Sequence, residues 1–357
     1  MSVSSSVYDY RYENGRRYHA YSEGTYLVPN DELEKDRLDL QHHTFRLTVD
    51  GALYIAPIPK DVQNVLDVGT GTGIWAIEFA DEHSSATVLG TDLSPIQPDS
   101  VPANCSFLID DADHEWLFRT KFDFIHARAM MAAFKDWPRF FQQSFANLNP
   151  NGFLELQEFH LPPICASNAS LNTYPAISPN PIIAWGQHLS SAGLKIGLDF
   201  SAAASFGLLL QAAGFVDIHQ RKLKWPYGPW AKGDKFKLLG KYARQDLNDG
   251  LGSSTLALFT RVLGWSREEV EVFNAGVRKE LREGVEGVWQ NVVFWYARKP
   301  VPGEDVGEQT ITVEQTELEI DEEFLAGRRK KMEDAKVTST QAESSDSIRK
   351  GYEVPSS

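Results

Sequence analysis

The sequence predicts an α/β protein in which helices cover both faces of a doubly wound, mostly parallel sheet. Two observations indicate this fold class. Apolar stretches of strand length alternate with stretches of helical spacing, and such alternation implies parallel strands joined by right-handed crossovers. The segment NVLDVGTGTGIW, at 64–75, runs from an apolar strand through three glycines into a helix. With 357 residues, 42% of them hydrophobic, the chain can bury a large core.

The elements of the first half follow in a regular order. A strand in VQNVLDVG leads to a helix over Thr72–His83, and ATVLGTDL forms a second strand that ends in an acid. Short strands follow in CSFLID and KFDFIHA. A helix over Trp137–Leu148 is stopped by the sequence NPNG, and GFLELQEF forms the fifth strand.

The second half supplies two closing strands and two helical insertions. A helix over Ser201–Ala213 is stopped by Gly214, and the strands lie in VDIHQRKL and VWQNVVFWYA. We expect the insertions at about 165–200 and 230–284, with the second interrupted at Gly250, Gly252 and Gly264. Residues 51–300 therefore form the predicted domain.

Residues 301–357 have a different composition from the rest of the chain. They carry 14 acids and 7 bases, a net charge of −7, and few large apolar side chains. Such a segment buries too little apolar surface to offset the entropy of ordering, so we predict a mostly disordered tail, with a short helix around Asp321–Lys336. The basic run Arg328–Lys331 is either a solvated helix end or a nuclear localisation patch.

Composition excludes several function classes. The formal charge of −14 argues against a broad nucleic-acid surface. No apolar run reaches the roughly 18 residues that span a bilayer, and the first 20 residues lack a signal-peptide core. The only cysteines, Cys105 and Cys165, have no metal-ligand spacing, and no paired carboxylates are placed to hold Mg²⁺. We predict no membrane, nucleic acid or metal, and a cytoplasmic location with a nuclear one as the alternative.

The three glycines predict a nucleotide-type cofactor site. A turn between a strand and a helix N-terminus presents backbone N–H groups, and glycine lets a ligand approach them. The spacing G-x-G-x-G differs from the dinucleotide pattern G-x-G-x-x-G, and Asp67 stands two residues before Gly69. A carboxylate there suits a cofactor with an ammonium group better than one with a pyrophosphate. S-adenosylmethionine has such a group.

Acids at the ends of the next two strands support this interpretation. Asp92, 23 residues beyond Gly69, can accept both ribose hydroxyls, or it can serve as a turn or cap residue in TDLSP. Asp110 and Asp111 follow CSFLID, where an acid can accept from the adenine amine. The carboxyl ends of successive parallel strands meet at the crevice where open α/β sheets bind ligands.

Several segments together resemble the successive motifs of class I S-adenosylmethionine-dependent methyltransferases, and more narrowly the fungal LaeA-like family. They are LDVGTGTGIWAIEFA, GTDLSPIQP, VPANCSFLIDDAD, KFDFIHAR, DWPRFF and LNPNGFLELQE, with YLVPNDELEKDRLDLQHH similar to the N-terminal family motif. The resemblance covers roughly residues 15–300. It implies a Rossmann-like, seven-stranded sheet and a cofactor whose methionine moiety, ribose and adenine lie at successive strand ends. The candidate cofactor-binding residues are Asp67, Gly69, Thr70, Gly71, Gly73, Asp92, Leu93, Asp110, Asp111, Ala112 and Arg37.

Arg37 belongs to a predicted N-terminal lid over residues 1–50. In DELEKDRLDLQHH, Leu33, Arg37 and Leu40 fall near the helical face that would dock on the sheet. Arg37 can then hold the cofactor carboxylate in a bidentate manner, or it can pair with an acid such as Glu34 on the helix surface. His42 in the same stretch either faces the site or is buried for structural reasons.

His126 is the candidate catalytic residue. At the end of DFIHAR, where amine methyltransferases of nucleobases and glutamine carry Asn or Asp followed by Pro-Pro and an aromatic residue, this chain has His126, Ala127 and Arg128. The departure argues against nucleobase methylation. His126 can act as a general base, or it can hold the loop. The cluster WPYGPW, Trp225–Trp230, is either a wall for a flat substrate or core packing.

We therefore predict a methyltransferase that modifies an oxygen or nitrogen atom of a small secondary metabolite. One alternative is a nuclear regulator of secondary metabolism that acts through protein partners. Another is a cofactor-binding fold that performs pericyclic chemistry, in which the sulfonium acts electrostatically.

Overall fold

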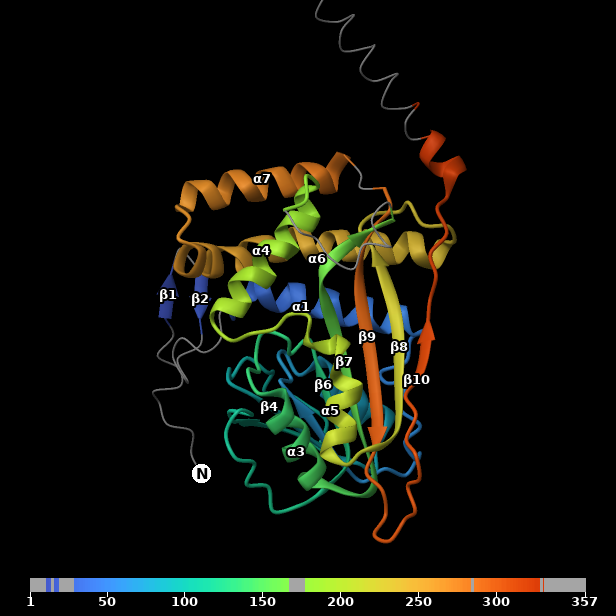
Figure 1. Ribbon diagram of the computed structural model, residues 1–357. Coiled ribbons are helices and arrows are strands. Elements are labelled where there is room, and N and C mark those ends of the chain that lie inside the picture. The colour runs from blue at the N-terminus through green and yellow to red at the C-terminus, as the bar shows by residue number, and fades with distance from the viewer. Residues whose placement is uncertain are drawn as a thin grey trace, which may run out of the picture.

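An eight-stranded sheet forms the centre of the computed structural model, which describes residues 11–13, 16–18, 29–166, 177–283, 286–327 and 330 (Figure 1). The strands are β3 (Asn64–Val68), β4 (Thr87–Asp92), β5 (Cys105–Ile109), β6 (Phe122–Arg128), β7 (Leu148–Cys165), β8 (Val216–Pro226), β9 (Val288–Arg298) and β10 (Thr312–Gln315). The helices are α1 (Glu32–Thr48), α2 (Ile74–Glu82), α3 (Trp137–Asn147), α4 (Pro181–Lys195), α5 (Phe206–Ala213), α6 (Asp234–Leu258) and α7 (Arg267–Glu283). A separate two-stranded sheet pairs β1 (Arg11–Glu13) with β2 (Arg16–Tyr18).

The strand order is β10-β8-β9-β7-β6-β3-β4-β5. All neighbouring strands of this sheet are parallel except β9, which runs antiparallel to both β7 and β8. The chain moves outward from β3 to β5 and then returns to place β6 on the other side of β3. The predicted fold class is confirmed, with one strand more than the seven expected. The switch between β3 and β6 is the position where such sheets bind ligands.

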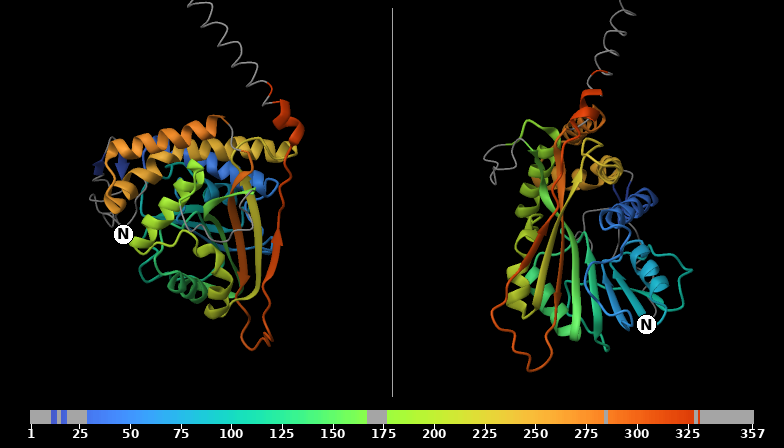
Figure 2. Two further views of the ribbon diagram at one scale, coloured as in Figure 1. Left: turned by 45° about the horizontal axis from the view of Figure 1, so that its top comes forward. Right: turned by 90° about the vertical axis from the view of Figure 1, so that its right-hand side faces the viewer.

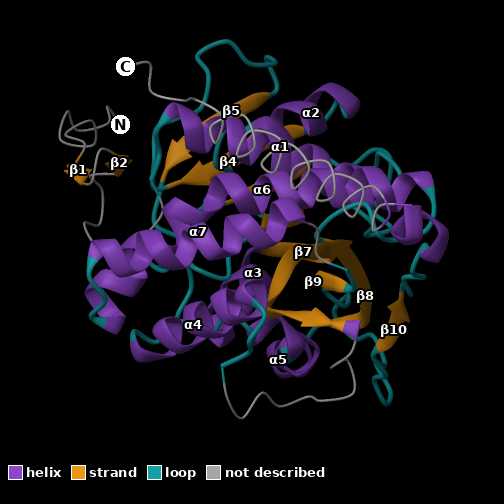
Figure 3. Cartoon of the chain, turned by 90° about the horizontal axis from the view of Figure 1, so that it is seen from above, coloured by secondary structure: helices purple, strands orange, loops and turns teal. Residues whose placement is uncertain are grey.

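Helices cover both faces of the sheet because strand residues alternate in direction (Figure 3). On one face, Trp75 and Phe79 of α2 pack with Phe153 of β7 in one hydrophobic cluster. On the other face, Phe141 of α3 and Phe206 of α5 lie with ring centroids 5.2 Å apart in a second cluster. The remaining helices, α1, α4, α6 and α7, lie together above the carboxyl ends of the parallel strands (Figures 1 and 2).

Local sequence signals set most helix ends. The side chain of Asp31 accepts a hydrogen bond from the Glu34 N–H at the start of α1, and Gly214 ends α5 with a φ of 97°. Gly264 likewise ends the short π-helix Phe259–Leu263 with a φ of 77°. The predicted interruptions at Gly250 and Gly252 are wrong, because both lie within α6. A side chain at Gly250 would lie 3.2 Å from Cδ of Arg37, so the missing Cβ gives α1 room to pack.

The prediction of a mostly disordered tail is wrong for the residues up to 327. β10 pairs in parallel with β8 and adds the eighth strand. Leu325 lies in a short helical turn, is 1% exposed, and belongs to a cluster with Trp230 and Trp289. The tail docks through the strand edge of β8 and through apolar side chains that pack against buried clusters, namely Ile311, Leu318, Phe324 and Leu325. Residues 331–357 and most of the basic run at 328–331 lie outside the described residues.

Candidate functional site: a cofactor cleft beside an apolar pocket

The glycine turn between β3 and α2 has a left-handed backbone at every second residue. Gly69, Gly71 and Gly73 have φ angles of 69°, 58° and 81°. A Cβ atom at Gly73 would lie 2.5 Å from Cζ of Phe107, and one at Gly69 would overlap the sulfur of Met130. The turn therefore requires glycine both for its backbone angles and for its close neighbours. These reasons explain the G-x-G-x-G spacing without a ligand.

Asp92, at the end of β4, holds this turn. One carboxylate oxygen accepts from the Gly71 N–H at 2.9 Å and the other from the Ser94 N–H at 2.9 Å. Burial raises the pKa of Asp92 to about 6. Each oxygen keeps a lone pair that can accept a further hydrogen bond. Asp92 thus stabilises the turn, as one of the two roles considered from the sequence, and its side chain also lines the cleft.

A cleft at the carboxyl ends of β3, β4, β5 and β6 brings together the predicted cofactor residues except Gly73 and Arg37, which do not line it. Its lining includes Asp67, Gly69, Thr70, Gly71, Asp92, Leu93, Asp110, Asp111 and Ala112. Gly73 lies in the same turn and is the N-cap residue immediately before α2. Helix α1 covers the cleft and contributes Glu34, Leu38 and Gln41 to it. Asp39 of this helix accepts a hydrogen bond from the Thr72 hydroxyl at 2.8 Å, which ties α1 to the glycine turn.

Asp67 and His126 form a buried pair beneath the glycine turn. Nδ1 of His126 lies 2.7 Å from one Asp67 oxygen, and the Thr70 hydroxyl donates to the other at 2.5 Å. The imidazole stacks on Trp75 with ring centroids 3.8 Å apart and is 1% exposed. Burial lowers the pKa of His126, and it outweighs the opposing effect of Asp67. The two residues lie opposite each other on β3 and β6, so the sheet register supplies the carboxylate partner that the sequence did not reveal.

The structure does not bring Arg37 to this cleft. Its guanidinium donates to Glu34 at 2.6 Å and to Asp246 of α6 at 2.7 Å. Burial opposes the charge of Arg37, but the two carboxylates outweigh it and raise its pKa. The pairing with Glu34 is the alternative weighed from the sequence. Arg37 therefore joins α1 to α6 instead of lining the cofactor cleft, and its side chain is only 13% exposed.

Arg128 is a site residue that the sequence reasoning missed. It is the last residue of β6, two positions after His126, and lines the cleft. Its Nη2 donates to Nδ1 of His42 at 3.1 Å, and its guanidinium lies 5.1 Å from the Phe45 ring. Burial lowers the pKa of Arg128 to about 10. Within the described part of the chain no carboxylate lies within 4 Å of its nitrogens, so the guanidinium can still bind an anion. The signal available in the sequence was an arginine at the end of the strand, two residues after His126.

His42 also has a structural role. Its Nε2 lies 2.8 Å from a Glu78 oxygen on α2, and Arg46 donates to the same oxygen at 2.6 Å. Burial, followed by the charge of Arg128, lowers the pKa of His42 to about 4. A neutral imidazole can accept from Arg128 while it donates to Glu78. These contacts join α1, α2 and the end of β6 around the cleft.

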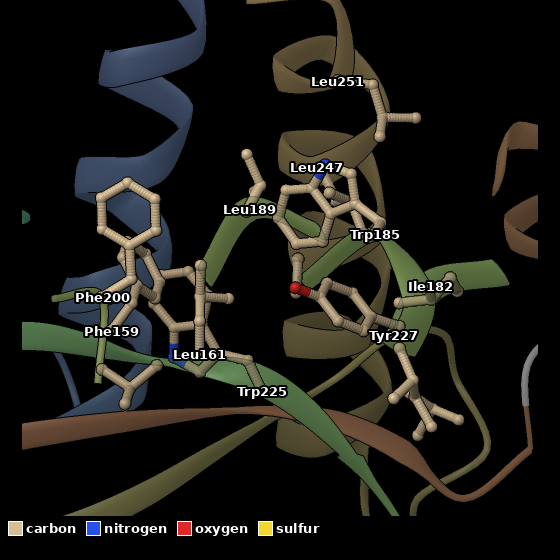
Figure 4. Close-up of a cluster of buried hydrophobic side chains, with 14 of the residues drawn as sticks. Phe159, Leu161, Ile182, Trp185, Leu189, Phe200, Trp225, Tyr227, Leu247 and Leu251 are labelled. Carbon is tan, nitrogen blue, oxygen red and sulfur yellow. The ribbon is translucent and has the colours of Figure 1, made fainter. Parts of the chain in front are cut away.

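A second cavity, the apolar pocket, adjoins the cofactor cleft. Leu38, Gln41 and Ala129 line both cavities. The aromatic side chains of the pocket are Phe159, Trp185, Phe200, Trp225 and Tyr227. Figure 4 shows Phe159, Phe200 and Trp225 grouped on one side and Trp185, Tyr227 and Leu247 on the other. Two residues of the WPYGPW cluster thus line a pocket, while Trp230 packs with the tail.

The segment after β6 separates the two cavities. Met130 and Ala133 face the cleft, whereas Met131 and Ala132 face the apolar pocket. The N–H groups of Met130 and Met131 donate to the two oxygens of Glu158 at 2.8 and 3.2 Å. Burial raises the pKa of Glu158 to about 8. A buried carboxyl group on β7 therefore holds the wall in place.

The residues of the cleft fit S-adenosylmethionine. Asp67 and Glu34 can pair with the ammonium group of the cofactor, and Arg128 can pair with its carboxylate. Asp92 can accept hydrogen bonds from the ribose hydroxyls. Among the described residues no group of three or more His, Cys, Asp or Glu side chains is arranged to hold a metal ion. In the same part of the chain no helix is long and apolar enough to cross a membrane.

The strand order with antiparallel β9, and the glycine turn after central β3, define the class I methyltransferase fold. Comparison with known proteins agrees. The family described as a methyltransferase domain matches residues 40–220. Methyltransferase pytC of Aspergillus terreus is 42% identical over 302 residues, which cover 84% of this chain and 91% of pytC. The probable methyltransferase tdiE of Emericella nidulans is 33% identical and covers 85% of this chain and 94% of its own. The secondary metabolism regulator LAE1 of Cochliobolus heterostrophus is 35% identical over a region that covers 81% of this chain and 94% of LAE1.

The chain belongs to this methyltransferase domain family, and S-adenosylmethionine is its cofactor. The family resemblance predicted from the sequence is confirmed.

Proposed function

We propose that this methyltransferase modifies an oxygen or nitrogen atom of a small secondary metabolite. The observation that carries the proposal is the apolar pocket, which shares Leu38, Gln41 and Ala129 with the cofactor cleft. A small molecule in that pocket lies beside the cofactor, and such proximity supplies much of the rate enhancement in group transfer. The similarity to methyltransferase pytC and to the probable methyltransferase tdiE supports methyl transfer.

We infer the following roles for the cleft residues. S-adenosylmethionine supplies an electrophilic methyl group on a sulfonium. Asp92 accepts the ribose hydroxyls, and Asp110, Asp111 and Ala112, with Leu93, surround the adenine. The turn from Asp67 through Gly73 surrounds the methionine moiety, with Arg128 in place of Arg37 at its carboxylate.

His126 holds Asp67 in this proposal instead of acting as the base. Its imidazole is 1% exposed, is stacked on Trp75, and uses Nδ1 for Asp67. A general base must reach the proton of the acceptor. The contacts of His126 therefore favour the loop-holding role that the sequence left open.

A regulatory function is the second candidate, and the similarity to the regulator LAE1 favours it. Such a protein would work in the nucleus with a protein partner. The cytoplasmic location, with the nuclear alternative, and the absence of nucleic-acid binding stay predictions.

Incubation of the purified protein with methyl-labelled S-adenosylmethionine and an extract of the source cells tests the proposal. We expect label in a small product. Label only in protein would favour the regulator. Cofactor binding without any label would favour the pericyclic alternative, and either result would contradict metabolite methylation.

A further inference from the structure

The apolar pocket carries enough chemistry to define what it accepts. We propose that it binds a neutral acceptor built on one or two flat rings, and that Asp246 accepts a hydrogen bond from the hydroxyl or amine group of that acceptor. This inference rests on the proposed function and names the class of its substrate.

The walls and size of the pocket fit flat rings. Five aromatic side chains line it together with Leu161, Leu189, Leu247 and Leu258. Aromatic walls favour ring substrates through offset and edge-to-face stacking. The cavity measures about 180 Å³. An apolar cavity of roughly 150 Å³ is enough to bind benzene, so this one holds at least one ring.

Asp246 marks the polar end of the pocket. Its Oδ1 accepts from Nη1 of Arg37 at 2.7 Å, and its Oδ2 accepts from Nε2 of Gln41 at 3.1 Å. A carboxylate has about four lone-pair sites, so Oδ2 can accept another hydrogen bond. The Asp246 residue is only 9% exposed, and an O–H or N–H group delivered by a ligand would find little competing water.

The polar end also lies next to the cofactor cleft. Gln41, which donates to Asp246, lines both cavities. Glu34, which binds the other side of Arg37, lines the cleft. A hydroxyl group bound at Asp246 therefore lies on the side of the pocket that adjoins the cofactor cleft.

The charges around Asp246 select against an anionic acceptor. Arg37 lies between two carboxylates, Glu34 and Asp246, and Glu34 also lies 3.7 Å from the guanidinium of Arg16. Burial raises the pKa of the nearby Tyr227, which keeps its phenol neutral, and its hydroxyl donates to Gln290. Arg37 thus has no uncompensated charge to offer a carboxylate or phosphate, and burying an unpaired anion is costly.

Three naphthalene probes test the inference on the wild-type protein saturated with S-adenosylhomocysteine. 2-Naphthol has a ring pair and a hydroxyl donor, 2-methoxynaphthalene lacks the donor, and 2-naphthoate is an anion. We expect calorimetry to show 2-naphthol bound about tenfold more tightly than 2-methoxynaphthalene, the usual scale for a hydrogen bond to a charged acceptor, and no binding of 2-naphthoate. Equal affinity for the first two, or preferred binding of 2-naphthoate, would overturn the proposal.

The variant Asp246→Ala tests the residue itself. It should reduce 2-naphthol affinity to that of 2-methoxynaphthalene and leave S-adenosylhomocysteine affinity unchanged. Asp249→Ala is the matched control, because Asp249 lies one turn on in α6 and is exposed. Retained 2-naphthol preference in Asp246→Ala would refute the role of Asp246. If Asp246→Ala does not fold, the comparison of the three naphthalene probes on the wild-type protein still tests the proposal. Failure of the wild-type protein to bind S-adenosylhomocysteine would instead contradict the proposed function.

Discussion

The cofactor cleft is lined mainly by residues that directly follow consecutive strands, whereas the apolar pocket beside it is lined by side chains from distant parts of the chain. Asp67, Asp92 and Asp110 each lie at or next to a strand end. By contrast, the Arg37–Asp246 pair joins residues 209 positions apart. The proposed cofactor contacts thus depend on short local motifs, and the proposed acceptor pocket depends on how α1, α4 and α6 pack. A change in the packing of these helices would therefore alter the proposed acceptor pocket without altering the cofactor motifs.

The largest effect is expected from Gly73→Val, which attacks the local motif. Its φ of 81° and the Phe107 ring leave no room for a branched side chain, so the glycine turn must shift. We expect S-adenosylhomocysteine affinity to fall by roughly 100-fold or more in calorimetry, since 3 kcal/mol corresponds to about that factor. Gly252→Ala, in an open position of α6, is the control and should leave affinity unchanged. Normal binding by Gly73→Val would disprove the requirement for glycine.

His126→Ala should lower both stability and cofactor affinity, since it removes the partner of Asp67 and the ring that stacks on Trp75. We expect a loss of roughly 2–4 kcal/mol in the free energy of unfolding. The exposed His43→Ala serves as control. A variant with unchanged Tm and cofactor affinity but turnover reduced about 10²–10⁴-fold would show instead that His126 is the base.

Asp92→Ala should weaken S-adenosylhomocysteine binding by about 2 kcal/mol and leave 2-naphthol binding unchanged. It loses the proposed ribose contacts and the hydrogen bond from the Gly71 N–H. Asp99→Ala, an exposed acid in the same loop, provides the comparison. Wild-type affinity in Asp92→Ala would remove this residue from the ribose site.

Glu158→Gln tests the wall that separates the two cavities. Burial raises the folded-state pKa of Glu158 to about 8, while the unfolded chain loses this proton near pH 4.5. Between pH 4.5 and about 8 the folded state keeps a proton that the unfolded chain has lost, so this contribution to stability declines as pH rises and is gone above about pH 8. We expect the wild-type free energy of unfolding to fall by about 1 kcal/mol from pH 7 to 9. In denaturant unfolding, the free energy of unfolding of Glu158→Gln should depend less on pH than that of the wild type. The control Glu268→Gln, at an exposed position, should keep the wild-type pH dependence.

Removal of the residues after Pro300 should have the smallest effect on either site. The truncated protein loses the pairing of β10 with β8 and the buried Leu325, so we expect its Tm to fall by about 5 °C. Affinities for S-adenosylhomocysteine and 2-naphthol should stay within twofold of wild type, because both cavities lie away from β10. An unchanged Tm would mean that the docked tail contributes nothing to stability.

Much of the cleft could be predicted because the parallel sheet itself gathers it. Once Asp67, Asp92 and Asp110 are assigned to strand ends, the fold brings them to one edge without further information. The same reasoning failed for Leu33, which the helical pattern placed on the docked face and which is 72% exposed. One turn of apolar spacing does not specify how far a packed face extends.

The amino-acid sequence by itself determined the order of strands and helices within residues 51–300 and the glycine turn, since these depend on neighbours within a few residues, and the resemblance of its successive motifs to a known family indicated the cofactor. Only the tertiary structure decided that Arg37 binds Asp246, that Arg128 lacks a carboxylate partner in the described chain, and that residues around Leu325 dock on the sheet. These outcomes depend on which side chains meet after helices far apart in sequence have packed. Burial then decides which charges are paired, because an unpaired charge in the interior costs more free energy than any local helix or strand preference supplies.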